Sequence, residues 1–187
     1  MMSKEFFEIQ KILKSKADKE VKVSAKKFVP TAKKIYGVKA LELNKLAVKY
    51  KIGGFKLAEE LWKSGAFEEK LLATKILGKV CKKDSDLTLK LIKKFSKDIS
   101  DWAVCDTLAT QGIRGIIKIK QKEILQIAKK LINSKNFWKR RFAIVLLINF
   151  VKDKNLKKEI EKIVKTVEND KEYYVKKAVD WIKRKMK

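Results

Sequence analysis

The sequence predicts an all-α protein, a right-handed superhelical solenoid of HEAT-like helical repeats. Three observations predict it: a composition suited to short-linked helices, an apolar periodicity that is helical almost throughout, and a repeat of 35 residues. The 187 residues are 45% apolar and 37% charged, with one proline and seven glycines. Such a chain can bury a substantial core and has few helix breakers, so we expect a single domain, residues 1–187, with short connections.

Apolar residues recur at helical spacing from the start of the chain. Phe6, Ile9 and Leu13 form the first stripe, which Ala17 extends. Residues 21–35 form the next unit, and Pro30 is expected there at a break or at a helix start. Glycines at 37, 53–54 and 65 are expected to separate helices at residues 41–50 and 55–63.

The same helical spacing continues to the end of the sequence. Residues 67–80 and 84–97 are expected helices, the second capped by Asp84 or Ser85. Ser100 or Asp101 is expected to cap the following helix, which carries Trp102 and Asp106. Beyond Gly112 and Gly115, helices are expected at residues 120–132, 137–151, 155–167 and 172–185. The total is about eleven helices, and no segment alternates as a β-strand would.

Three segments share a pattern that ends in alanine: residues 67–73, 137–143 and 172–178. Their alanines, Ala73, Ala143 and Ala178, are separated by 35 residues or by twice that number, and the missing position falls at Leu108. Two helices in a unit of this length indicate a HEAT-like repeat, in which small residues at recurring positions allow close stacking.

The repeat register also relates the candidate functional residues to one another. Asp106, Arg141 and Lys176 are 35 residues apart and should occupy equivalent positions on stacked helices, which lie about 8–10 Å apart. We therefore expect them to form a row along one inner surface. Trp102, one turn before Asp106, and Trp181, four residues after Lys177, can reach the same surface. The candidate DNA-binding residues expected to make it basic are Lys139, Arg140, Lys176, Lys177 and Arg184.

The chain carries a formal net charge of +26, from 48 basic and 22 acidic residues. A surplus of this size indicates a polyanionic partner, with nucleic acid as the first candidate. Lysine-rich surfaces are also typical of hyperthermophile proteins, but acidic residues would then be expected in similar number. An acidic protein is the alternative partner for the same basic surface.

Several classes of site are excluded by composition. The chain has no histidine, which excludes Ser-His-Asp triads, histidine bases and zinc sites that use histidine. Cys81 and Cys105 are isolated thiols without a disulfide framework, and no glycine-rich phosphate loop is present. No apolar run is long enough to span a membrane, and the first residues lack a signal-peptide core. We expect a cytoplasmic monomer that needs no metal or cofactor and does not contact membranes.

Trp102 and Asp106 are four residues apart and therefore project from one face of a helix. An indole beside a carboxylate can hold an apolar ring edge and stabilise positive charge at the same point. The alternative is an ordinary amphipathic helix with a tryptophan in the core and an aspartate at its boundary. The two residues alone do not decide between these interpretations.

Five segments, in order and at compatible spacing, resemble the DNA alkylation repair glycosylases of the AlkD type. They are residues 36–38 with 41–43, 61–64 with 69–73, 101–106, 138–143 and 177–184. The resemblance implies a superhelix of HEAT-like repeats that holds duplex DNA on a basic concave face. It departs from the family pattern at Asn44, where an arginine is expected, and at Asp180, where a glycine is expected.

The resemblance also implies site residues and a reaction. Asp106 would be the catalytic carboxylate, Trp102 and Trp181 would flank the sugar of the damaged nucleotide, and Arg141 would bind the nearby DNA backbone. The substrates would be N3- or N7-alkylated purines such as 3-methyladenine and 7-methylguanine, excised from duplex DNA without base flipping. Such purines are cationic and leave as neutral bases, so they need no general acid, which suits a chain without histidine.

A non-catalytic function stays open beside this enzymatic one. Basic helical solenoids can bind bent or branched DNA without any catalytic carboxylate. Asp106 together with two tryptophans at the matching positions argues for the enzyme.

The positive charge predicts that DNA binding depends steeply on salt and barely on base sequence. Each phosphate that the protein neutralises releases roughly 0.9 counterion, so the logarithm of affinity should fall linearly with the logarithm of salt concentration. Titration of a labelled undamaged duplex at several salt concentrations measures the slope. A flat plot would contradict a contact surface made of lysine and phosphate.

Overall fold

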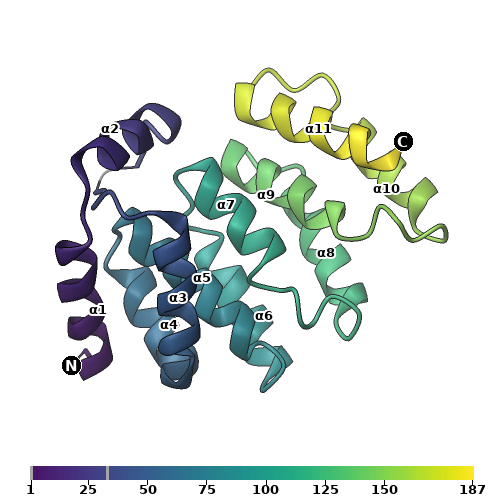
Figure 1. Ribbon diagram of the computed structural model, residues 1–187. Coiled ribbons are helices and arrows are strands. Elements are labelled where there is room, and N and C mark those ends of the chain that lie inside the picture. The colour runs from purple at the N-terminus through teal and green to yellow at the C-terminus, as the bar shows by residue number, and fades with distance from the viewer. Residues whose placement is uncertain (1, 33) are drawn as a thin grey trace.

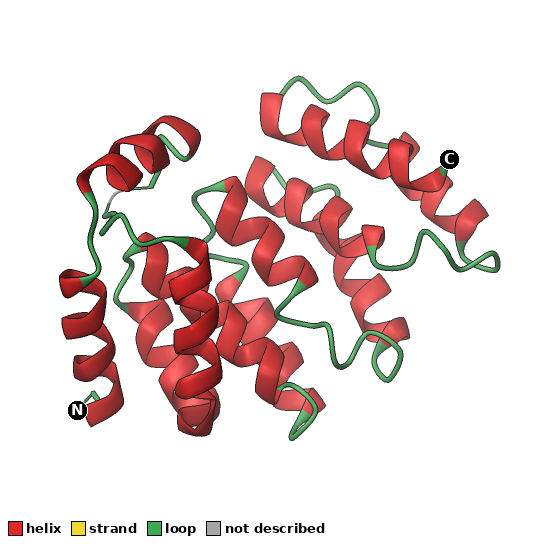
Figure 2. Cartoon of the chain, in the orientation of Figure 1, coloured by secondary structure: helices red, strands yellow, loops and turns green. Residues whose placement is uncertain are grey.

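The computed structural model describes residues 2–32 and 34–187, and within them it is helical, with no strand (Figures 1 and 2). The α-helices are α1 (Lys4–Ser15), α2 (Lys19–Phe28), α3 (Ala40–Lys49), α4 (Gly54–Lys63), α5 (Phe67–Val80), α6 (Ser85–Phe95), α7 (Trp102–Thr110), α8 (Gln121–Leu131), α9 (Phe137–Ile148), α10 (Lys157–Lys165) and α11 (Tyr173–Met186). A short 3-10 helix, η1 (Lys51–Gly53), precedes α4. The prediction of an all-α chain is confirmed.

Four helices, α5, α7, α9 and α11, form a central row in which each packs against the next. The flanking helices α4 and α8 pack against α5 and α9, and α6 contacts α4. Figure 1 shows the helices following one another across the molecule, with the N- and C-termini at opposite ends. This arrangement is that of a helical-repeat protein; the right-handed superhelix stays a prediction.

The 35-residue register is visible in the core. Ala73, Leu108, Ala143 and Ala178 lie on the four helices of the central row, and each is completely buried. Alanine stands at three of the four positions, where its small side chain lets neighbouring helices approach closely; Leu108 is the larger exception.

Several helix ends differ from the predicted ones, for local reasons. α2 ends at Phe28 and does not continue to Ile35, because Pro30 disfavours helical backbone at Val29 and has no N–H to donate. The Gly53–Gly54 pair, predicted to separate two helices, closes η1 and begins α4, with Gly54 at φ +61°. The expected caps are confirmed at Asp84 and Asp101, whose carboxylates accept N–H groups in the first turns of α6 and α7.

A buried carboxylate holds the segment that links α2 to α3. Glu68, 1% exposed, accepts the backbone N–H groups of Tyr36, Gly37 and Val38 at 2.9, 2.7 and 3.2 Å. Gly37 has φ +93°, and a Cβ there would lie 2.4 Å from the carbonyl oxygen of Asp18, so only glycine fits. Glu68 therefore fixes the position of the segment that leads into α3.

Among the described residues, no helix combines the length and the apolar character needed to cross a membrane.

The approach of α5 to the end of α7 predicts an unusual effect of adding one methyl group. A Cβ on Gly78 would lie 2.1 Å from the carbonyl oxygen of Gln111, so Gly78→Ala must push the two helices apart. Although Gly→Ala in a free helix stabilises by about 0.5–1 kcal/mol, we expect Gly78→Ala to lower the free energy of unfolding by about 1–3 kcal/mol. Denaturant unfolding measures the change, with exposed Lys79→Ala as the control. A stabilised Gly78→Ala variant would contradict this close approach.

Candidate functional site

The candidate site begins at the first residues of α7. Asp101, 2% exposed, caps the helix by accepting the N–H of Val104 at 2.8 Å. The cap fixes the direction of the helix and places Trp102 in its first turn, with Asp106 one turn later. The indole N–H of Trp102 donates to the carbonyl oxygen of Phe28 at 2.6 Å, which ties α7 to the end of α2. The indole itself stays partly exposed.

Asp106 and Arg141 form a bidentate ion pair between α7 and α9. The Nε and Nη2 atoms of Arg141 donate to the two carboxylate oxygens of Asp106 at 3.0 and 2.8 Å. The third nitrogen, Nη1, donates to the carbonyl oxygen of Tyr174 on α11 at 2.6 Å. One guanidinium thus connects three consecutive helices of the central row. The side chains of Arg141 and Asp106 are only 7% and 17% exposed, so the pair is poorly screened by water.

Burial and the charge of Arg141 shift the pKa of the Asp106 carboxyl in opposite directions. Burial raises the pKa of the Asp106 carboxyl above its ordinary value, and the hydrogen bonds and charge of Arg141 oppose that rise. The carboxylate therefore faces the cationic guanidinium of Arg141. Burial also raises the pKa of the neighbouring Cys105 thiol, which is fully enclosed and therefore a poor nucleophile.

The row expected from the repeat register is only partly formed. Asp106 and Arg141 are in direct contact, whereas Lys176 is exposed on α11 and faces the region of Asp170. Trp181 is partly buried on the same helix and packs against the core. Trp102 and Trp181 therefore lie on α7 and α11, on either side of the helix that carries Arg141.

The other basic residues expected at this surface fall into two groups. Lys177 and Arg184 are exposed on α11, and the Lys177 ammonium lies 5.5 Å from the centre of the Tyr173 ring. Arg140 is engaged within the protein, where its Nε and Nη2 atoms donate to Asp170 at 2.6 and 3.1 Å. Lys139 lines a groove between α6 and α8. The five basic residues that the sequence predicted on one surface therefore point in different directions.

Two partners at the site had no signal in the sequence. The carbonyl oxygens of Phe28 and Tyr174 fix Trp102 and Arg141, but a carbonyl belongs to every residue and marks none. The aromatic side chains of Phe137, Trp138 and Tyr174 also pack together beside Arg141, with the Trp138 and Tyr174 rings 4.8 Å apart. Trp138 and Tyr174 are 36 residues apart, close to the repeat length, and this spacing could have indicated the cluster.

The arrangement can stabilise a positive charge but is poorly suited to proton donation. A carboxylate fixed by two hydrogen bonds lies one turn from a partly exposed indole, in a chain without histidine. The fold and this site define a helical-repeat protein with a preorganised anion at its centre. The chain matches, over residues 9–186, the model of the family described as DNA alkylation repair enzyme, and it belongs to that family.

A solved structure supports the fold independently. The predicted DNA alkylation repair enzyme from Enterococcus faecalis superposes with a TM-score of 0.77 at 14% sequence identity, covering 91% of this chain and 83% of that one. Among curated proteins, no relative matches the chain.

The Asp106–Arg141 pair predicts strong energetic coupling between α7 and α9. Arg141→Ala leaves a mostly buried carboxylate without its partner, so we expect the free energy of unfolding to fall by about 3–5 kcal/mol. Asp106→Ala instead leaves the buried guanidinium without its carboxylate. The double variant should lose much less unfolding free energy than the sum of the two single losses. A double-mutant cycle by denaturant unfolding measures this coupling.

A surface pair is the matched control. Lys183 and Glu168 are 43% and 41% exposed, so Lys183→Ala should cost about 0–1 kcal/mol. Additive losses for Asp106→Ala and Arg141→Ala would show that the two side chains do not interact in solution.

Proposed function

We propose that this member of the DNA alkylation repair family is a DNA glycosylase. It would hydrolyse the N-glycosidic bond of cationic N3- or N7-alkylpurines, such as 3-methyladenine and 7-methylguanine, in duplex DNA. The observation that carries the proposal is the Asp106 carboxylate, held by Arg141 and 17% exposed, one turn from Trp102. The family match supports alkylated DNA as the substrate class.

The proposed reaction needs an anion and a water molecule. Alkylation has already placed a positive charge on the purine, so the bond from C1′ to nitrogen can break with its electron pair moving to the base, which leaves neutral. The sugar becomes oxocarbenium-like, and water adds to C1′ while its proton passes to solvent. Asp106 stabilises the sugar cation, and a preorganised group of this kind contributes about 3–4 kcal/mol to lowering the barrier.

The tryptophans would hold the sugar beside this carboxylate. A cation near an indole face gains about 0.5–2 kcal/mol, and Trp102 and Trp181 are both partly exposed. The hydrogen bond from Trp102 to Phe28 fixes the indole plane before substrate arrives. Preorganisation of this kind saves the cost of ordering the ring during the reaction.

Arg141 would act chiefly by positioning Asp106. Three of its five N–H groups are used by Asp106 and by the carbonyl oxygen of Tyr174. The phosphate contact that the resemblance implies would use the remaining two. Lys176, Lys177 and Arg184, which are exposed on α11, would supply further contacts to the DNA backbone, where phosphate contacts position the protein.

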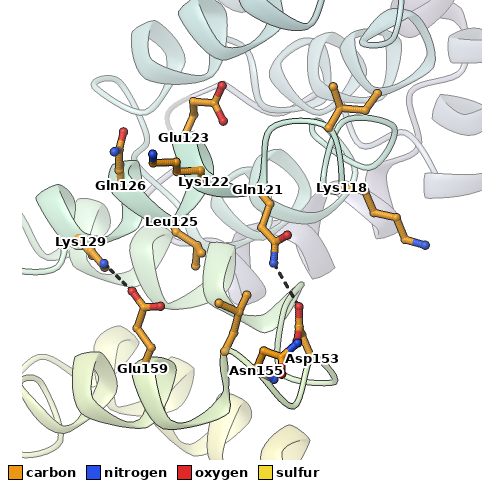
Figure 3. Close-up of a pocket in the computed structure, with 12 residues that line it drawn as sticks. Lys118, Gln121, Lys122, Glu123, Leu125, Gln126, Lys129, Asp153, Asn155 and Glu159 are labelled. Carbon is orange, nitrogen blue, oxygen red and sulfur yellow. Dashed lines mark hydrogen bonds and ion pairs between the residues drawn. The ribbon is translucent and has the colours of Figure 1, made fainter.

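The proposal includes excision without base flipping. A cavity of about 620 Å³ lies between α8 and α10 and shares no lining residue with the Asp106 site (Figure 3). The base would stay in the duplex while the Asp106 carboxylate acts on its sugar.

A second function is favoured by one observation. Asp106 is neutralised inside the protein by Arg141, and such a pair could serve only to join α7 to α9. The protein would then be a non-catalytic module that binds bent or branched DNA through its lysines.

Replacing the carboxylate separates the two functions. Asp106→Asn removes the charge that faces the developing sugar cation, so single-turnover release of 7-methylguanine should fall by about 100-fold or more. Binding to undamaged duplex should stay intact or become tighter, because one negative charge has been removed near the phosphates. Asp180→Asn, an exposed aspartate on α11, is the matched control and should keep normal release.

Trp102→Ala is expected to reduce both release and binding, since the indole would hold the sugar throughout.

Undiminished release by Asp106→Asn would end the catalytic assignment. Binding without any release by the unmodified protein would favour the non-catalytic module.

A further inference from the structure

A groove between α6 and α8 has a different character from the Asp106 site. Its volume is about 520 Å³, within the usual range for ligand sites. The apolar part is formed by Leu131 of α8, which is partly exposed, and by the edge of Ile127, which is 7% exposed. The polar part is formed by lysines from three helices. We call it the α6–α8 groove; its lysines are Lys93, Lys97, Lys130 and Lys139.

The charge of the α6–α8 groove is not balanced within the protein. Four lysines and one glutamate line it, a net of +3 (4 − 1), and none of the four lysines has an ion-pair partner within the described part of the chain. The glutamate, Glu123, is itself paired with Lys120 at 3.3 Å. Neighbouring lysines on the same two helices are paired, Lys94 with Glu59 and Lys129 with Glu159.

The larger cavity between α8 and α10 provides a comparison (Figure 3). It is lined by three lysines and three carboxylates, a net of zero (3 − 3). Its polar groups bond to one another, Gln121 to Asp153 and Lys129 to Glu159. Positive charge around an apolar floor is therefore a property of the α6–α8 groove and not of every gap between these helices.

The floor distinguishes between two kinds of anionic partner. A nucleic-acid backbone would satisfy the lysines but would gain nothing from Ile127 and Leu131. A peptide with carboxylates and a large apolar side chain would use both, as interfaces do when a buried anchor is surrounded by a polar rim. The methylene stems of the lysines extend the apolar surface while their ammonium groups stay in water.

The groove also lies apart from the Asp106 site. Lys139 and Arg141 are two residues apart on α9, so their side chains project about 200° apart around the helix axis. Arg141 points to α7 and α11, and Lys139 lines the groove formed with α6 and α8. A partner in the groove would leave Asp106 accessible.

We propose that the α6–α8 groove is a docking site for an acidic peptide segment with an apolar anchor, carried by a partner protein. The carboxylates of the segment pair with Lys93, Lys97 and Lys130, and its apolar side chain packs on Ile127 and Leu131. The site is independent of base excision, so the protein can hold such a partner and DNA together.

The probe is a short capped peptide of alternating aspartate and leucine, titrated into the full chain. Two control peptides replace leucine with serine or aspartate with lysine. We expect saturable binding of the first peptide only, with methyl chemical-shift changes centred on Ile127 and Leu131. Undamaged duplex DNA at saturation should leave the peptide bound.

Variants test which side chains of the groove contribute to peptide binding. Lys93→Glu with Lys130→Glu should weaken peptide binding by about tenfold or more, because two favourable charges become repulsive. Lys118→Glu with Lys122→Glu makes the same charge change at exposed lysines of the larger cavity and should leave affinity within about twofold. Leu131→Ala should weaken binding by about tenfold without altering its salt dependence. Circular dichroism confirms that each variant is folded.

Four outcomes would overturn the proposal. They are the absence of saturable binding, equal binding of the aspartate–serine peptide, shift changes centred outside the groove, and displacement of the peptide by duplex DNA. The last would make a phosphate backbone the ligand of the groove. None of these measurements depends on base release, so they fail or succeed separately from the glycosylase assignment.

Discussion

The hydrogen bonds of Arg141 are the interaction on which the centre of this molecule depends. One guanidinium bonds the Asp106 carboxylate on α7 and the Tyr174 carbonyl on α11 while it belongs to α9. Because both charged groups are mostly buried, each needs the other to offset the cost of leaving water. The same contact that stabilises the packing of three helices also fixes the position of the proposed catalytic group and opposes the rise in its pKa that burial causes.

The protein separates its two kinds of charge by depth. Three mostly buried carboxylates are bound to the chain itself: Glu68 to three backbone N–H groups, Asp101 to the start of α7, and Asp106 to Arg141. Exposed positions carry most of the lysines, whose surplus gives the net charge of +26. Buried anions therefore shape the fold, and exposed cations remain available for phosphates or other anions.

The two sets of helices offer different surfaces. The central row holds Trp102, Asp106, Arg141 and Trp181, and within it α7 and α9 have a packed neighbour on each side. Between the flanking helices α6 and α8 there is a groove with unpaired lysines and an apolar floor. Repeat proteins expose long surfaces relative to their cores, and separate rows of helices can therefore serve separate partners.

The sequence by itself determined the helical class, most helix positions, the cap at Asp101 and the register that unites Ala73, Leu108, Ala143 and Ala178. These follow from periodicity and from residues that interact within one turn, which a sequence displays directly. It also brought Asp106 and Arg141 to equivalent positions on stacked helices.

Only the tertiary structure decided that the two would bond, that Arg140 would turn to Asp170, and that Lys139 would line a groove between α6 and α8. The partners of Trp102 and Arg141 are backbone carbonyls 74 and 33 residues away. A contact between residues so far apart in the sequence depends on how whole helices pack. Every residue carries a carbonyl oxygen, so the sequence could not indicate which one would bond.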